Sequence, residues 1–359
     1  MKIHGLALAA LLGAAGTAHA QSAVTLFALI DLNVTQYKAG GKAGGGSLRV
    51  MNDGTVNGLN GSRWGVRASE DLGGGLKAGV VLESGVLADT GSLAQGGRGF
   101  GRQAFISLSA PSWGELRLGR QYILEDSVMG LSNPFGNALV NNPGTGITNM
   151  GRALPLWLNA PRADNVMQWQ SPRWGGFSVA GQFAPGEGTA DRFSGVKAAY
   201  GAGPFNAAVS YEWNKARAGG ERTNQSLTIG ANYDFGVLKV LGGIQDNSKL
   251  ATGSVNGAAS GVSNLVVTGA TTFNMRETRG YTIGVEVPIG LTLLGVNHTL
   301  VRYESATGQS QDLGKLAVAV RYALSKSTFL YGGASVATGD LKDYISQKTV
   351  LQAGMRTAF

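Results

Sequence analysis

The sequence predicts an all-β protein, a 16-stranded antiparallel transmembrane β-barrel behind a cleaved export signal. Three observations carry this prediction. Apolar and polar side chains alternate with period two along most of the chain. Short turns and long polar loops follow one another in strict order, and no segment after the first twenty residues is apolar enough to span a membrane as a helix. We expect one domain over residues 21–359, the transmembrane β-barrel.

The first twenty residues have the features of a signal peptide. Lys2 supplies the positive region, residues 6–15 form a short apolar core, and Ala18-His19-Ala20 is a small-x-small cleavage site. The apolar run is shorter than the roughly 20 residues that a membrane helix needs. We therefore expect residues 1–20 to be removed on export and the mature chain to begin near Gln21.

The composition excludes several classes of chemistry. Because the chain has Cys 0, it offers no disulfide, no thiolate nucleophile and no cysteine metal site. Two of its three histidines lie in the signal, so His298 alone remains for metal binding or general-base catalysis. We expect no metal, no cofactor and no enzymatic activity.

The charge is basic but dispersed. The formal net charge of +8 becomes +7 once Lys2 is removed, and the 57 glycines are spread through short strand-like runs. A basic balance can indicate nucleic acid, anionic lipid or anionic solutes as partners. The basic residues stand singly along alternating strands and not in runs, which favours the lining of a channel and excludes nucleic acid.

The period-two alternation is clear at both ends of the mature chain. In the first strand, residues of even number are apolar, from Val24 to Val34, while Asp31, Asn33 and Thr35 stand on the opposite face. In the last strand Leu351, Ala353, Met355 and Phe359 oppose Gln352, Gly354 and Arg356. Each strand therefore has one apolar and one polar face.

The connections distinguish a membrane barrel from a soluble sandwich. Seven short turns contain glycine, proline, aspartate or serine, and they lie at residues 71–74, 110–114, 171–175, 201–204, 234–236, 288–290 and 324–327. Eight longer polar loops lie between them, at residues 38–60, 85–100, 121–161, 184–192, 214–224, 245–278, 304–312 and 336–348. These connections join sixteen strands and put both chain ends on the short-turn side. An even strand number with short periplasmic turns and long outer loops is typical of bacterial outer-membrane barrels.

A sheet that spans a lipid bilayer must close on itself and is anchored by side chains at the membrane interfaces. Because the hydrocarbon cannot satisfy free backbone groups, the first and last strands must pair. Tyrosines near strand ends are predicted to form aromatic girdles at the membrane interfaces, namely Tyr200, Tyr211, Tyr233, Tyr322 and Tyr331. The expected location is the cell outer membrane.

The second strand indicates which face is wet. If Trp64, Val66 and Ala68 face lipid, then Arg63 and Arg67 face the lumen. The reverse would place two guanidinium groups in hydrocarbon, at about 2–4 kcal/mol each near the midplane. The lumen assignment is therefore preferred, and the secondary lumen residues are predicted to be Arg67, Arg120, Lys77 and Asp164.

Several segments together resemble the general porins of β-proteobacteria. They are Gly61-Ser62-Arg63-Trp64-Gly65, residues 70–78 with the sequence EDLGGGLKA, residues 101–105 with the sequence GRQAF, and Leu118-Gly119-Arg120-Gln121. The resemblance runs from Val24 to Phe359. It implies a homotrimer of sixteen-stranded subunits in outer-membrane lipid, each with a third outer loop folded into the barrel. The terminal Phe359 resembles the assembly signal of the family.

The resemblance also implies a constriction loop at residues 121–161. Its Asn133-Pro134-Phe135-Gly136 is similar to a Pro-Glu-Phe-Gly tip in related porins, but the glutamate is missing. The acidic residues of the loop are Glu125 and Asp126 alone, while Arg152 is basic. This departure favours anions over cations.

An arginine cluster is expected opposite that loop. By family position it consists of Arg63, Arg102 and Arg162, which resemble the arginines of anion-selective members. Arg162 alternates with Asp164 and Gln168 and so faces the lumen. Arg102 shares the parity of Ala104 and Ile106, and a bulge or a place beyond the bilayer is needed to turn it inward.

The expected function is passive diffusion of small hydrophilic solutes and inorganic ions, with a preference for anions. A substrate-specific channel for phosphate or an organic acid would use the same fold and the same arginines. An outer-membrane enzyme is disfavoured by the histidine inventory. A surface adhesin is a third alternative, because loops 245–278 and 336–348 are long and polar.

Overall fold

The computed structural model describes residues 23–55, 58–137, 161–188, 190–217, 220–250 and 273–359, together with the short pieces 254–255, 258–259 and 266–267. The predicted signal peptide at residues 1–20 and residues 138–160 of the predicted constriction loop lie outside this range. Among the described residues, no helix combines the length and the hydrophobicity of a membrane span.

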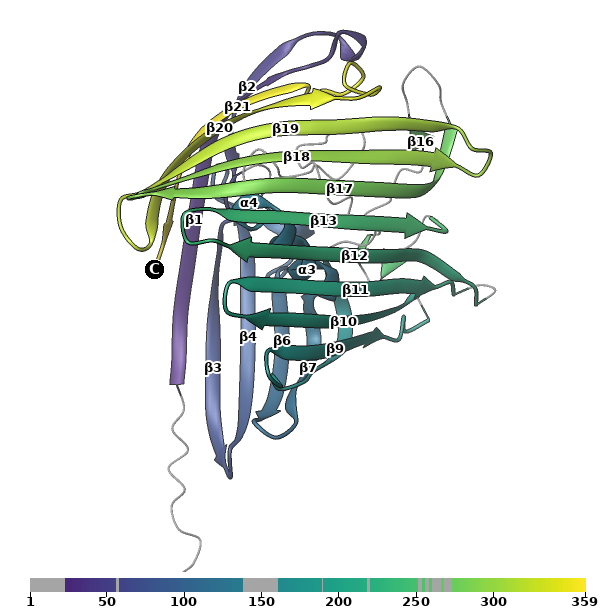
Figure 1. The fold of residues 1–359 in the computed structure, drawn as a ribbon. Coiled ribbons are helices and arrows are strands. Elements are labelled where there is room, and N and C mark those ends of the chain that lie inside the picture. The colour runs from purple at the N-terminus through teal and green to yellow at the C-terminus, as the bar shows by residue number, and fades with distance from the viewer. Residues whose placement is uncertain are drawn as a thin grey trace, which may run out of the picture.

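Sixteen long strands form one closed antiparallel barrel, which confirms the predicted fold class (Figure 1). They are β1 (Ala23–Lys38), β3 (Arg63–Gly73), β4 (Leu76–Leu87), β6 (Gln103–Ala110), β7 (Gly114–Tyr122), β8 (Arg162–Gln170), β9 (Phe177–Ala184), β10 (Arg192–Ala202), β11 (Phe205–Lys215), β12 (Arg222–Asp234), β13 (Lys239–Ser248), β17 (Phe273–Ile289), β18 (Thr292–Ser305), β19 (Ser310–Ala323), β20 (Thr328–Thr338) and β21 (Thr349–Ala358). Strand β1 pairs with β21 from Leu29↔Ala358 to Lys38↔Thr349, so the sheet has no open edge there.

All seven predicted turns join paired strands. Two of them share the same turn chemistry, in which an aspartate carboxylate accepts from the backbone N–H two residues later. Gly73 donates to Asp71 at 2.9 Å and Gly236 donates to Asp234 at 2.8 Å, and both glycines have positive φ.

The long connections also fall where the sequence placed them, and several contain short elements. These are η1 (Gly41–Ala43), β2 (Ser47–Asp53), β5 (Ser92–Leu93), α2 (Ala94–Gly97), α3 (Leu124–Ser132), α4 (Pro134–Asn137), β14 (Ser254–Val255), β15 (Ala258–Ala259) and β16 (Val266–Val267). Only β2 joins the wall for more than two residues, by pairing with the outer half of β1.

The two faces of the sheet are those that the alternation predicts. Outward side chains such as Leu26 and Leu351 are 71% and 60% exposed in the isolated chain, as expected of groups that contact lipid. The inward face is polar and bonded to itself. Gln352 on β21 donates to Asn33 at 3.1 Å and to Thr35 at 2.9 Å across the closing seam.

The aromatic girdle holds with one exception. Phe177 and Tyr200 lie 4.5 Å apart between ring centroids near the short turns, and Tyr233 and Phe235 lie equally close. Tyr331 was wrongly assigned to this girdle. It is 5% exposed, faces the lumen and donates its hydroxyl to Asp31. A buried tyrosine needs a partner for its hydroxyl, and Asp31 supplies one.

Candidate functional site

The third outer loop lies inside the ring of strands. Figure 1 shows α3 and α4 within the barrel, and α3 packs against β11, β12 and β13. Leu124, Val128 and Met129 are almost fully buried between the helix and the wall. The described part of the predicted constriction loop therefore reduces the cross-section of the lumen.

Inward-facing glycines let the wall accept this loop. A Cβ added at Gly243 would lie 2.6 Å from Ser132 Cβ, and one at Gly284 would lie 2.8 Å from the Pro134 ring. Side chains at Gly230 and Gly295 would collide with Val128 and Phe135. A loop docked this closely requires strands without side chains at the contact.

Glu125 anchors the start of the loop to the wall. Its carboxylate accepts from Ser226 at 3.3 Å, from Thr228 at 3.0 Å and from Gln245, and its own N–H donates to Glu212 at 2.8 Å. Burial raises the pKa of Glu125 to about 7. One of the two acids expected in the loop therefore faces the wall and not the aqueous path.

The tip of the loop is anchored farther along the same wall, on β17, which pairs directly with β13. The Phe135 N–H donates to Glu286 Oε1 at 2.6 Å, and Asn133 Oδ1 accepts from Thr282 at 2.9 Å. Glu286 also pairs with Lys239 at 3.5 Å. The carboxylate that is missing from the tip sequence is thus present on β17, where it binds the loop backbone.

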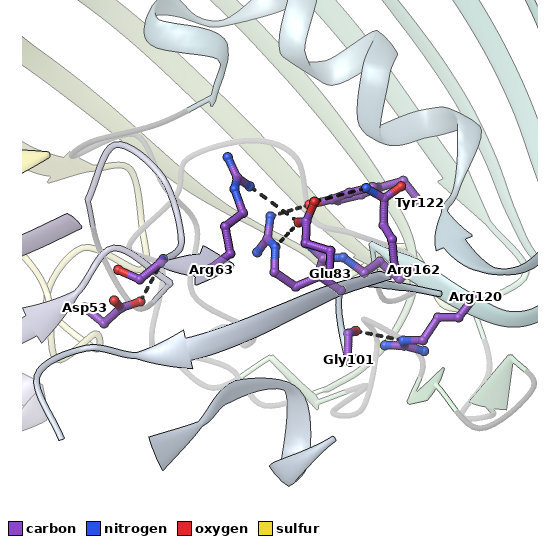
Figure 2. Close-up of polar contacts among 10 residues, drawn as sticks. Asp53, Arg63, Glu83, Gly101, Arg120, Tyr122 and Arg162 are labelled. Carbon is purple, nitrogen blue, oxygen red and sulfur yellow. Dashed lines mark hydrogen bonds and ion pairs between the residues drawn. The ribbon is translucent and has the colours of Figure 1, made fainter. Parts of the chain in front are cut away.

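The three arginines share one network of polar contacts, and Figure 2 shows Arg63, Glu83, Tyr122 and Arg162 close together. Arg102 binds Glu83, and Arg63 Nη1 lies 3.9 Å from the same carboxylate. Tyr122 links the group, because its hydroxyl accepts from Arg102 at 2.5 Å and from Arg162. The Arg162 guanidinium also lies 4.1 Å above the Tyr122 ring. The sequence prediction that these arginines share one site is consistent with this geometry.

Arg102 turns inward because it lies outside its strand. Strand β6 begins at Gln103, and the Arg102 N–H bonds to the Glu83 carbonyl at 3.1 Å just before it. Ile106 is 57% exposed on the outward face of β6. Arg102 has the same parity, but it precedes the first residue of the strand and so does not have to point outward. Its position before the strand provides the inward turn that the sequence required.

The cluster carries more positive than negative charge. The three arginines face Glu83, and Asp126 on α3 attracts Arg102 and Arg162. Arg67 lies four residues below Arg63 on β3, with its guanidinium 4.3 Å from the Phe27 ring. A recess of about 320 Å³ is lined by Arg63, Arg67, Glu83, Gln103 and Tyr122, among others. This recess therefore borders the arginine cluster.

Two residues expected in the lumen are placed differently. Arg120 pairs in register with Ala104 on the outward face of β6 and forms an ion pair with Asp164. Asp164 also binds Arg98 at 2.8 Å. Figure 2 shows Arg120 pointing away from the three arginines, toward the Gly101 carbonyl. Arg120 keeps the outward parity of Leu118 on β7. The register between β7 and β8 contains one extra residue on β8 between Ala163 and Val166, which moves Asp164 off the lumen face.

Lys77 lies on the lumen face of β4, as expected, but far along the strand from the arginine cluster. It shares the face of Glu83, six residues away on β4, or about 20 Å along a strand. Lys197 also faces the lumen and donates to Ser127 of α3 at 2.9 Å. These lysines extend the basic lining beyond the cluster.

The sequence interpretation missed Glu83 and Tyr122. Glu83 lies on the inward face of β4, which alternation could have identified, and Tyr122 ends β7 just before the loop. His298, in contrast, lies on the exposed outward face of β18, so it is not part of the lumen. No group of three or more metal-ligating side chains occurs within the described ranges.

Comparison with known proteins adds independent findings. The family model described as Gram-negative porin matches residues 7–342. An outer membrane porin of Bordetella pertussis is 31% identical over the full length of both chains. Outer membrane porin protein 32 of Delftia acidovorans is 33% identical over 90% of this chain and 86% of its own.

The solved structures agree. An anion-selective porin from Comamonas acidovorans superposes with a TM-score of 0.72 and 27% identity, over 94% of this chain and 100% of its own. OmpT of Vibrio cholerae, in a form that lacks loop L8, superposes with a TM-score of 0.67 at 13% identity, over 94% and 99% of the two chains.

Proposed function

This chain belongs to the Gram-negative porin family and is an outer-membrane porin, and we propose that its lumen prefers small anions during passive diffusion. Its relatives are channel proteins and not enzymes. Solutes move down their own gradients, so no cofactor or energy source takes part.

The arginine cluster is the observation that carries the proposal. Arg63, Arg102 and Arg162 stand on neighbouring parts of one wall, where Glu83 pairs with Arg63 and Arg102 and the Tyr122 hydroxyl accepts from Arg162. Charges on a narrow, low-dielectric wall focus the field and raise the local concentration of counter-ions. Arginine keeps its charge at any working pH, so the preference does not depend on titration.

The third loop supports the same conclusion. Glu125 is fully buried against β12 and β13 and so presents no charge to the aqueous path, and the tip sequence contributes no acid. Asp126 is the acid on the described loop that acts on the arginines. The similarity to the anion-selective porin from Comamonas acidovorans agrees with this reading.

We propose a homotrimer in outer-membrane lipid as the working form. The outward face of β1 and β21 is strongly apolar, with Val24 and Leu26 both 71% exposed and Met355 51% exposed. Faces of this kind must be covered by lipid or by another subunit. Phe359, with an 84% exposed ring at the barrel end, is proposed to be the assembly signal.

Reversal potentials across a salt gradient in planar bilayers test the anion preference. We expect chloride to be more permeant than potassium, and the triple variant Arg63→Ser, Arg102→Ser and Arg162→Ser to lose most of that preference. The matched control is Arg279→Ser with Arg302→Ser, which removes arginines that are 54% and 53% exposed on the outer surface.

Two results would count against the proposal. Cation preference in the unmodified channel would refute it outright. Equal selectivity in the lumen triple variant and the outer-surface control would show that other residues determine it.

A further inference from the structure

The wall of the barrel is interrupted between β2 and β3. Strand β1 pairs with both, from Leu32↔Asp53 upward with β2 and from Leu29↔Arg63 downward with β3. Between these two pairings the chain covers three residue steps on β1, from Leu29 to Leu32, but ten steps on the paired side, from Asp53 to Arg63. The surplus is residues 54–62, which the wall cannot accommodate in register. Residues 54–55 and 58–62 of this segment are described by the structure.

Asp31 draws this segment into the lumen. Asp31 is fully buried on the inward face of β1, and its carboxylate accepts from the Asn60 N–H at 2.7 Å and from the Tyr331 hydroxyl. The Asp31 backbone takes part as well, since its carbonyl accepts from Gly54 at 2.9 Å and its N–H donates to Ser62 Oγ at 2.9 Å. One wall residue thus binds both ends of the segment.

Asp53 closes the base of the segment. Its carboxylate accepts from the Thr55 N–H at 2.7 Å, from Ser62 at 3.4 Å and from Ala88 of the next loop at 3.2 Å. Backbone N–H groups that leave a sheet lose their ladder partners, and an acceptor of this kind replaces them. The segment is therefore held by directed bonds at its base and along its inner side.

The middle of the segment reaches the third loop. Leu59 is 7% exposed and belongs to a buried apolar cluster with Tyr331, Ala317 and Ala319 of the lumen wall, against which Phe135 of the loop tip packs. Two inward projections therefore pack on one apolar cluster of the lumen wall. A lumen that is narrowed by both projections has a smaller open section than one narrowed by the third loop alone.

The segment also borders the arginine cluster. A Cβ added at Gly61 would lie 3.1 Å from Arg102 Nη1 and 2.7 Å from Thr55 Oγ1. A Cβ at Gly58 would lie 3.0 Å from the Tyr331 hydroxyl. Glycine at both positions lets the backbone press directly on these polar groups.

We propose that the segment after β2, in its described residues 54–55 and 58–62, forms a second constriction element, positioned by Asp31, which sets the size limit of the channel together with the third loop. Asp31, Tyr331 and Leu59 act as positioning residues, because they hold the segment against the lumen wall. The proposal deepens the channel function proposed above. It concerns solute size, whereas the arginines concern solute charge.

Liposome swelling with a series of neutral sugars of increasing size measures the size limit. We expect Leu59→Ala to admit sugars that the unmodified channel excludes, and to raise the single-channel conductance. The matched control is Leu316→Ala, the same truncation on the outward face of β19 beside Ala317. It should leave the size limit and conductance unchanged.

Tyr331→Phe provides the second test. It removes one donor to Asp31 and keeps the ring in its cluster, so the barrel remains intact while the segment is held less firmly. We expect increased current noise and a size limit between those of the unmodified channel and Leu59→Ala. Heat-modified migration in detergent gels reports whether each variant is folded.

The outcomes separate this proposal from the anion proposal. If folded Leu59→Ala and Tyr331→Phe both keep the unmodified size limit, residues 54–62 do not narrow the path and the inference is wrong. If both variants shift the size limit while the unmodified channel prefers cations, the second constriction stands and the anion proposal fails.

Discussion

Docking of the third loop depends on glycines in the barrel wall, which have no side chain at the contact, and Gly284→Ala tests this directly. Gly284 lies on the inward face of β17, where an added Cβ would stand 2.8 Å from the Pro134 ring and 3.0 Å from Asn297 Nδ2. The proline ring is rigid, so the loop tip must move. Gly242→Ala is the control, because Gly242 lies next to this site on the outward face, with its nearest neighbour at 3.4 Å.

The expected magnitude follows from the overlap. Contacts of 3.4 Å are ordinary for a Cβ, so the Pro134 ring has to retreat by roughly 0.6 Å. Overpacking of this kind costs about 1–3 kcal/mol. Since 1.4 kcal/mol is a factor of ten, the population of undocked loop should rise by about 5-fold to about 140-fold.

Thiol labelling measures that population. The chain has Cys 0, so Ser132→Cys introduces a single thiol at a position that is 4% exposed in the docked loop. We expect a maleimide to label this thiol faster in Gly284→Ala than in Gly242→Ala, by the factor given above. Labelling of folded protein is followed by mass spectrometry.

Equal labelling rates in the two glycine variants would refute the reasoning. They would mean that the loop tolerates a side chain at Gly284, so the inward glycines do not set its position. A loss of folding in Gly284→Ala alone would leave Gly243→Ala, which meets Ser132 Cβ at 2.6 Å, as the equivalent test.

Three further predictions follow from the same geometry. Burial raises the pKa of Glu125 from 4.5 to about 7, so the docked loop favours the protonated acid, and docking should be strongest below about pH 4.5 and weaken as the pH rises to about 7. The thiol of Ser132→Cys should therefore be labelled faster as the pH rises from about 4.5 to about 7, relative to the same thiol in a Glu125→Gln background. A ratio of the two labelling rates that does not change with pH would contradict this prediction. Phe359→Ala should lower the yield of assembled porin in cells but not refolding in detergent, because the Phe359 ring is exposed while its backbone pairs with Ala28; equal yields in cells would exclude an assembly signal. Native mass spectrometry of the detergent-solubilised porin should give three chains per particle, and a monomer would exclude the proposed trimer.

The barrel could be predicted from the sequence because it is repetitive. Lipid on one side and water on the other impose the same alternation on every strand, so Val24, Leu26 and Val34 already identify the outward face of β1. Turn chemistry at Asp71 and Asp234 then fixes where strands end. These signals are local, and each one is repeated many times.

The predictions that failed did so for different reasons. Tyr331 has the parity of the lumen, yet its place near a strand end suggested a girdle residue, and only the fold brings it to Asp31, 300 residues away. Arg120 has the outward parity of Leu118, so alternation already contradicts its assignment to the lumen, whereas Asp164 is displaced by an extra residue on β8 that the sequence does not reveal. Residues 54–60 fall in the predicted outer loop 38–60, because nothing local in the sequence shows that Asp31 binds this segment.

The site combines fixed charges with adjustable width. Arg63 and Arg162 lie on strands, and Arg102 is tied to one by its backbone, so the sheet determines their spacing. Like charges at such spacing repel, and Glu83 and Tyr122 offset this by accepting from them. The segments that narrow the lumen carry Phe135 and Leu59 and are loops, which tolerate changes in length at little cost. Selectivity for charge can therefore be retained in the wall while the size limit changes through the loops, which is why the two should respond to different substitutions.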